Sequence, residues 1–284
     1  TQWTLDGSIG PAAYSINTVN SMPVLKSLET HGTYRAPRIG RCWLFDGAND
    51  FARLASAITL TGQFALSLWF ERSTSATTVA IAGRSTNFAN LVWIPNDSQL
   101  YLSNNAGTGV TFDVPTMTTD TPYHVVVTRD GSNNVRLYFN GVESTSRAQT
   151  LSGSIIWDQL GCRFDTASHF PGKLWDVRIY SVGKTSGEAS AIYSQHATPE
   201  TIDTTGIVAG WWCNEESGLT GYDWSGNGND LTLTNITQAT FHSADTSVKY
   251  NAANWLGYTL SGSVLIPRDE SDTAKDVTGS ALGN

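Results

Sequence analysis

The densest group of potential ligands is a polar segment at residues 223–230, which reads Asp-Trp-Ser-Gly-Asn-Gly-Asn-Asp. Three of its side chains carry oxygen atoms within seven consecutive residues: Asp223, Asn227 and Asn229. Calcium takes about six to eight oxygen ligands in a flexible geometry. The segment is therefore a candidate structural Ca²⁺ site, and Asp176 or Asp46 would complete its ligand set. Because Asp, Asn and Gly also favour turns without any ion, a plain turn is the alternative.

Tryptophan side chains are the second kind of candidate, because aromatic rings can stack on sugar rings in binding sites. The chain has ten of them. Four stand in alternating segments that are typical of buried strands: Trp43, Trp69, Trp175 and Trp211. Trp157 and Trp224 stand beside turn residues instead, so we expect these two to be better exposed and to bind carbohydrate.

The carboxylates and histidines show no catalytic arrangement. Retaining glycosidases hold two carboxyl groups about 5–5.5 Å apart, and the E-x-D-x-[x]-E signature that supplies such a pair on one strand of glucanases is absent from the sequence. Glu215 and Glu216 are adjacent, so on a strand they face opposite ways. His124 alternates into an apolar segment, where we expect it to be packed and hydrogen-bonded. The sequence predicts a protein that is not an enzyme, and a glycan-degrading enzyme is the least favoured function.

The composition favours an all-β protein. Of the 284 residues only 15% are charged, the net charge is −8, and 26 residues are glycine. Few Lys and Glu residues, with many Thr, Val and aromatic residues, are typical of strands and turns. The acidic balance argues against nucleic-acid binding, which needs a basic surface. No apolar run of about 18 residues is present that would span a membrane.

Alternating apolar and polar residues indicate short strands separated by turns. These strands lie at 64–70, 90–94, 99–102, 123–128, 135–139, 172–180 and 206–213. Asn140-Gly141 favours a type I′ hairpin turn. Thr185, with Glu188 three residues later, has the spacing of a capping box and predicts one short helix over 185–193. The pattern predicts a β sandwich or jelly roll.

Cysteine is scarce, and no two cysteines stand close together in the sequence. Cys42, Cys162 and Cys213 show no C-x-x-C motif, so a zinc site of the usual kind is not indicated. We expect three buried thiols that act as small apolar side chains. One disulfide between two of them is the alternative.

Four segments share the order and spacing of a known family. They are Trp43-Leu-Phe-Asp-Gly-Ala-Asn-Asp-Phe51, Phe64-Ala-Leu-Ser-Leu-Trp-Phe70, Tyr123-His-Val-Val-Val-Thr128 with Val135-Arg-Leu-Tyr-Phe-Asn-Gly141, and Phe170-Pro-Gly-Lys-Leu-Trp-Asp-Val-Arg-Ile-Tyr180. Over residues 40–195 the chain thus resembles laminin-G-like, concanavalin A-like domains. The resemblance implies a jelly-roll sandwich of two antiparallel sheets with one short helix.

A fifth segment, 208–218 followed by 223–230, resembles a block that opens the domain in many members of this family. Here it follows the helix, so it either closes the same sandwich or begins a second, degenerate copy. Only about 50 residues remain after it, too few for another sandwich, and we favour closure. We therefore expect a sandwich over 35–236 with extended arms at 1–34 and 237–284. The family often holds a structural calcium, which agrees with the first hypothesis for Asp223.

The end of the chain suggests a setting. Residues 262–279 are similar to segments of bacteriophage structural proteins. This similarity implies a non-enzymatic virion surface or appendage protein, such as a capsid decoration, head fibre or tail-associated protein. Its partners would be other virion proteins, host surface glycans or both, and it would be oligomeric in an assembly. The alternative is a secreted or cell-surface carbohydrate-binding adhesion module.

Overall fold

The computed structural model describes residues 41–75, 78–86, 89, 92–146, 148–164, 168–194, 203–215 and 218–240, and the backbone of two short strands at 258–261 and 264–267. Arm 1–34 and most of arm 237–284 lie outside these residues. Within the described part, the all-β sandwich that the sequence predicts is confirmed. No described helix is long and apolar enough to cross a membrane.

The strands form two antiparallel sheets. Sheet A has the order β10 (Val142–Glu143), β9 (Asn134–Phe139), β8 (Pro122–Arg129), β3 (Phe64–Arg72), β13 (Pro171–Tyr180), β1 (Arg41–Asp46) and β17 (Thr237–Thr240), with β11 (Gln149–Thr150) on β9 and β14 (Ile207–Trp211) on β13. Sheet B has the order β15 (Thr220–Gly221), β16 (Leu231–Thr234), β2 (Phe51–Leu60), β12 (Ile155–Leu160), β4 (Val79–Gly83), β5 (Val92–Asn96), β6 (Gln99–Ser103) and β7 (Gly109–Asp113). A separate two-stranded sheet pairs β18 (Tyr258–Ser261) with β19 (Val264–Pro267).

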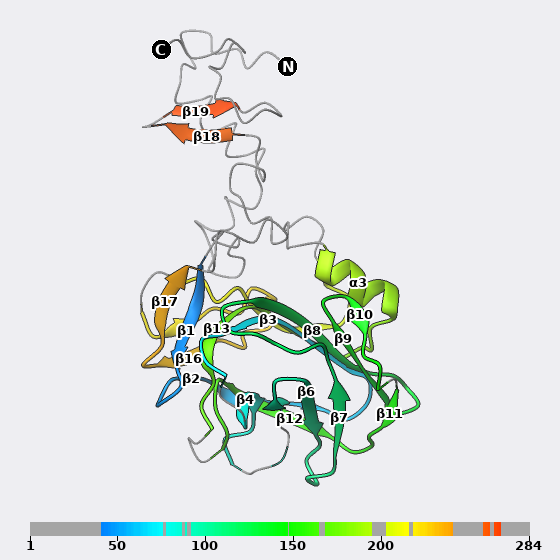
Figure 1. The fold of residues 1–284 in the computed structure, drawn as a ribbon. Coiled ribbons are helices and arrows are strands. Elements are labelled where there is room, and N and C mark those ends of the chain that lie inside the picture. The colour runs from blue at the N-terminus through cyan, green and yellow to red at the C-terminus, as the bar shows by residue number, and fades with distance from the viewer. Residues whose placement is uncertain are drawn as a thin grey trace.

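The core lies between the two sheets, and alternation decides which side chains enter it. In β3, Phe64 and Leu66 point into the core, whereas Ala65 belongs to a second apolar cluster on the other face of sheet A. Figure 1 shows that α3 (Ser186–Ser194) lies over this outer face. The helix buries Ala189 and Ile192 there. Sheet A is therefore covered on both faces near the helix, which explains the uninterrupted burial along β3.

The helix begins where the sequence predicts. Thr185 donates its backbone N–H and its hydroxyl to the Glu188 carboxylate, at 2.7 and 2.6 Å, and the Glu188 N–H donates back to the Thr185 hydroxyl at 3.3 Å. This reciprocal capping box satisfies N–H groups that the first helical turn leaves without a partner. The predicted hairpin turn is also present, since Asn140 and Gly141 both have positive φ, at 48° and 78°.

The segment after the helix closes the same sandwich. Strand β14 pairs with the second half of β13, while β1 pairs with the first half, and the change of neighbour falls at a bulge where Asp176 has a φ of 48°. Strand β16 joins sheet B beside β2. Strand β17 then pairs with β1, so the sandwich runs to Thr240, and the predicted boundary at residue 236 is wrong by one strand.

The buried polar residues behave as the sequence predicts. All three cysteines are buried thiols, and burial raises the pKa of the Cys42 thiol to about 12. His124 is buried, and its Nε2 lies 3.0 Å from the Ser67 hydroxyl. Its ring packs 5.0 Å from that of Trp69. These groups therefore serve packing on the two sheets.

Candidate functional site

The two tryptophans expected to bind carbohydrate are not exposed. Trp157 is 2% exposed and packs edge-to-face on Phe64, with ring centroids 5.7 Å apart. Trp224 is 3% exposed and stacks on Trp212 at 4.9 Å. A Cβ at Gly210 would lie only 2.2 Å from the Trp224 ring, so this ring rests directly on strand β14. The predicted exposure is wrong for both rings because Trp157 alternates inward on β12 and the 223–230 turn folds over β14.

The 223–230 turn uses its oxygen atoms internally. One Asp223 carboxylate oxygen accepts the Gly210 and Ser225 N–H groups, both at 2.9 Å. The other accepts the Ser225 hydroxyl and the Asn229 N–H, also at 2.9 Å. The amide nitrogens of Asn227 and Asn229 donate to the Val208 carbonyl at 3.1 and 2.8 Å. The turn is therefore built on a carboxylate with four protein donors.

The other two proposed calcium ligands have separate partners. The Asp176 carboxylate is buried and accepts two hydrogen bonds of 2.7 Å from Arg178. Asp46 is the last residue of β1, and it accepts the Ala48 and Asn49 N–H groups of the following turn at 2.7 and 3.2 Å. Among the described residues, no group of three or more His, Cys, Asp or Glu side chains is arranged to hold a metal ion. The donor set at the turn does not fit calcium.

Chelation tests whether the 223–230 turn holds a calcium ion. We expect EDTA to leave the thermal midpoint of the chain unchanged, because four protein donors already satisfy Asp223. Differential scanning fluorimetry with EDTA and with added CaCl₂ measures the midpoint. A rise on adding calcium that EDTA reverses would restore the calcium hypothesis.

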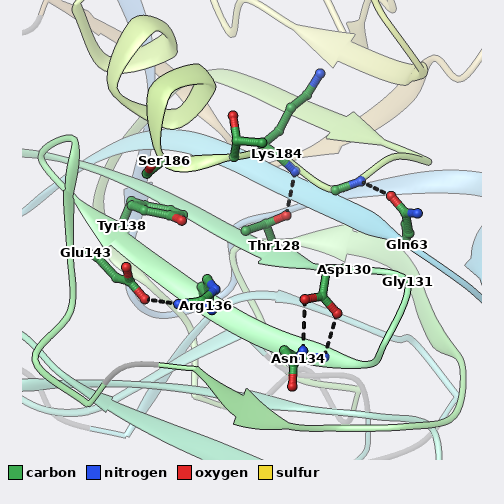
Figure 2. Close-up of a pocket in the computed structure, with 12 residues that line it drawn as sticks. Gln63, Thr128, Asp130, Gly131, Asn134, Arg136, Tyr138, Glu143, Lys184 and Ser186 are labelled. Atoms are coloured by element: carbon green, nitrogen blue, oxygen red, sulfur yellow. Dashed lines mark hydrogen bonds and ion pairs between the residues drawn. The ribbon is translucent and has the colours of Figure 1, made fainter.

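A polar pocket of about 400 Å³ lies instead on the outer face of sheet A (Figure 2). Its floor is made by strands β8 and β9, including Thr128, Arg136 and Tyr138. The β8–β9 turn forms one wall, and β10 with the loop into α3 forms the other. It is lined by Gln63, Thr128, Asp130, Gly131, Asn134, Arg136, Tyr138, Glu143, Gly183, Lys184, Thr185 and Ser186. Backbone pairing of β8 with β9 fixes the floor, since Arg136 stands opposite Thr128.

Asp130 is the best-oriented acceptor of the pocket. One of its carboxylate oxygens accepts the Ser132 and Asn134 N–H groups at 2.8 and 2.9 Å, and the other accepts the Asn134 side-chain amide at 2.9 Å. The Asn134 amide and these backbone donors hold the pKa of Asp130 below its ordinary value of 3.8. The carboxylate therefore stays ionised, and its direction is set by the tight β8–β9 turn.

Arg136 and Glu143 form the charged pair of the pocket. Their side chains are 40% and 34% exposed, and the guanidinium Nη1 lies 2.5 Å from the Glu143 carboxylate. This bond raises the pKa of Arg136 above its ordinary value. Figure 2 shows both side chains on the same side of the strand ribbon, beside the Tyr138 ring. The pair presents a planar donor and a planar acceptor to solvent.

Lys184 lines the pocket with its backbone, and its charged group does not enter the pocket. Its backbone N–H donates to the Thr128 hydroxyl at 2.8 Å, which anchors the loop to the floor. Its side chain is fully buried, and the ammonium donates to Asp203 at 2.5 Å and to the Thr205 carbonyl at 3.1 Å. Figure 2 shows this side chain pointing away from the pocket. The Gly183 N–H bonds the Gln63 amide oxygen at 3.1 Å, which fixes the same loop from the other side.

The comparisons with known proteins agree with the fold. The sequence profile of the laminin-G-type "concanavalin A-like lectin/glucanases superfamily" matches residues 46–190, just over half of the 284 residues. The chain belongs to this family. The match ends within α3, so β14, β16 and β17 are additions to the matched region that complete both sheets.

Two solved structures have a similar fold. A Bacteroides ovatus ATCC 8483 protein provisionally named for carbohydrate binding has a TM-score of 0.55 and 17% identity, over 72% of this chain and 61% of that one. A heptameric SAP-like pentraxin from Limulus polyphemus has a TM-score of 0.51 and 14% identity, over 72% of this chain and 96% of that one. No curated protein sequence matches the chain. At these identities the likeness establishes the fold alone.

Proposed function

We propose that this chain is a non-catalytic glycan-binding domain and that the sugar binds in the polar pocket over sheet A. The main support is that the polar side chains of the pocket are already held in fixed orientations by the protein. Asp130, Asn134 and the Arg136–Glu143 pair are each fixed by hydrogen bonds within the protein, and all four line one hollow. Sugar hydroxyls need planar donors and acceptors in fixed positions, because ordering flexible groups on binding would cost affinity.

The acid–base properties of the pocket support binding over hydrolysis. A glycosidase needs a carboxylic acid with a raised pKa to protonate the leaving group. The pKa of Asp130 is lowered instead, and the Glu143 carboxylate is engaged by Arg136. Elsewhere, Glu215 is buried and accepts the Trp43 indole N–H and the Tyr222 N–H, both at 2.8 Å. These carboxylates orient and stabilise neighbouring groups, which supports a binding role.

The shared fold adds support, since the Bacteroides ovatus protein of similar fold is provisionally named for carbohydrate binding. For the setting, we propose the surface of a virion, where the domain would contact host glycans or neighbouring virion proteins. The similarity of residues 262–279 to bacteriophage structural proteins supports it. That segment lies outside the described residues apart from the backbone of β19. A secreted adhesion module is the alternative, and electron cryo-microscopy of the native particle would separate the two.

A glycan array read with matched variants tests the binding proposal. We expect the full chain to bind a defined subset of glycans, and Arg136→Met to weaken that binding by about tenfold or more, because a charge-assisted donor is lost. Arg84→Met is the control, since Arg84 lies outside the pocket and bonds Asn105. Equal weakening by both variants, or no binding to any glycan, would contradict the proposal.

A further inference from the structure

We infer that the pocket selects neutral sugars and discriminates against sugars that carry a carboxylate, an inference that rests on the proposed glycan-binding function. Among the residues that the structure describes, three charged side chains face the pocket: the Asp130 and Glu143 carboxylates and the Arg136 guanidinium. Two negative charges thus stand against one positive charge. A neutral sugar meets a full set of donors and acceptors there, whereas an anionic sugar meets a net negative field.

The positive charge is already neutralised within the protein. Arg136 is paired with Glu143 at 2.5 Å. An incoming sugar carboxylate could form a bidentate bond with this guanidinium only by displacing Glu143, which would leave the Glu143 carboxylate beside a second anion. Asp130 does not reduce this repulsion by taking up a proton, because its lowered pKa keeps it ionised.

Lys184, a second cation among the described lining residues, directs its charged group away from the pocket. Lys184 lines the pocket through its backbone, while its fully buried ammonium is held by Asp203 and lies 4.1 Å from the centre of the Tyr180 ring. Turning the ammonium into the pocket would break the bonds to Asp203 and to the Thr205 carbonyl. The lysine is therefore a structural tie and does not act as an anion-binding group.

The partial positive charge at the start of α3, which also borders the pocket, is neutralised as well. A helix N-terminus carries a partial positive charge that attracts anions. Here the Glu188 carboxylate accepts both the N–H and the hydroxyl of Thr185, so a negative charge already sits on that end. All of these arrangements act in the same direction, toward ligands without negative charge.

Matched sugar pairs provide the test. Glucose and glucuronic acid, or galactose and galacturonic acid, differ only in a hydroxymethyl group against a carboxylate at C6. We expect oligosaccharides of the neutral member to bind the full chain about tenfold or more tightly than their acidic counterparts at low ionic strength, with the difference shrinking as salt screens the pocket.

Glu143→Gln should reduce this discrimination to about threefold or less, because Arg136 then becomes available to the sugar carboxylate. Asp120→Asn is the matched control: it removes the same charge from an exposed turn outside the pocket, at a residue with positive φ that Asn tolerates. It should leave the discrimination unchanged. Tighter or equal binding of the acidic sugars by the wild-type chain would overturn the inference while leaving the glycan-binding proposal standing. Failure to bind any member of either series would overturn both.

Discussion

Replacing Arg129 by methionine should lower the free energy of unfolding by about 3 kcal/mol or more, because several buried carbonyl groups lose their donor together. The Arg129 guanidinium is fully buried and donates to the carbonyls of Gly62, Gly153, Leu151 and Leu60. It thereby ties the β2–β3 turn to the 151–153 loop, directly beside the pocket. Methionine keeps a long unbranched stem but supplies no donor. Urea denaturation followed by tryptophan fluorescence measures the change.

Arg136→Met is the matched control for this experiment, since it makes the same change on the neighbouring strand at a side chain that is 40% exposed. We expect it to alter the free energy of unfolding by about 0.5 kcal/mol or less. The two arginines should therefore separate cleanly: one supports the fold, and the other serves the pocket. Similar losses of stability in both variants would show that the assigned roles are wrong.

Trp157→Ala should cost about 3–5 kcal/mol of stability, the usual range for removing a large aromatic side chain from a core. Trp157 is 2% exposed and fills the space between the sheets against Phe64. Thermal and urea unfolding of the variant measure the loss. Val142→Ala is the control, because Val142 is 70% exposed and its truncation should change stability by about 0.5 kcal/mol or less.

The same variant also separates a core role from a sugar-binding role. Well below its lowered midpoint, Trp157→Ala should bind glycan within about twofold of the wild-type chain, because Trp157 lies on β12 of sheet B and does not line the pocket. A small loss of stability with a large loss of binding would instead restore Trp157 as a carbohydrate ligand.

Much of the fold could be predicted because its signals are local. Alternation in 64–70 and 172–180, the Asn140-Gly141 turn and the Thr185–Glu188 capping box each report a neighbourhood of a few residues, and β3, β13 and α3 follow them closely. The closing strands carry weaker local signals. β17 is short, and its partner β1 stands at the opposite end of the sandwich in the sequence. Nothing near residue 237 therefore indicates which strand β17 pairs with.

The residues of the proposed binding pocket could not be predicted in the same way, because exposure depends on what covers a residue. Trp224 stands in a turn, yet the turn folds back so that the ring rests on Gly210. Asp223 looks like a metal ligand from its neighbours, yet Gly210, from a different strand, supplies one of its four donors. The pocket is assembled from β8, β9, β10 and the loop before α3. The strands on either side of its Asp130–Asn134 turn are predicted from the sequence, but the neighbours of the turn in space are not.

Chemical-shift mapping shows whether a glycan binds over the outer face of sheet A. We expect that titrating an oligosaccharide ligand into ¹⁵N-labelled chain shifts the amide signals of residues 128–138, 143 and 183–186, which line the pocket or stand beside its lining residues. Shifts confined to β4–β7 of sheet B, with this set unmoved, would contradict it.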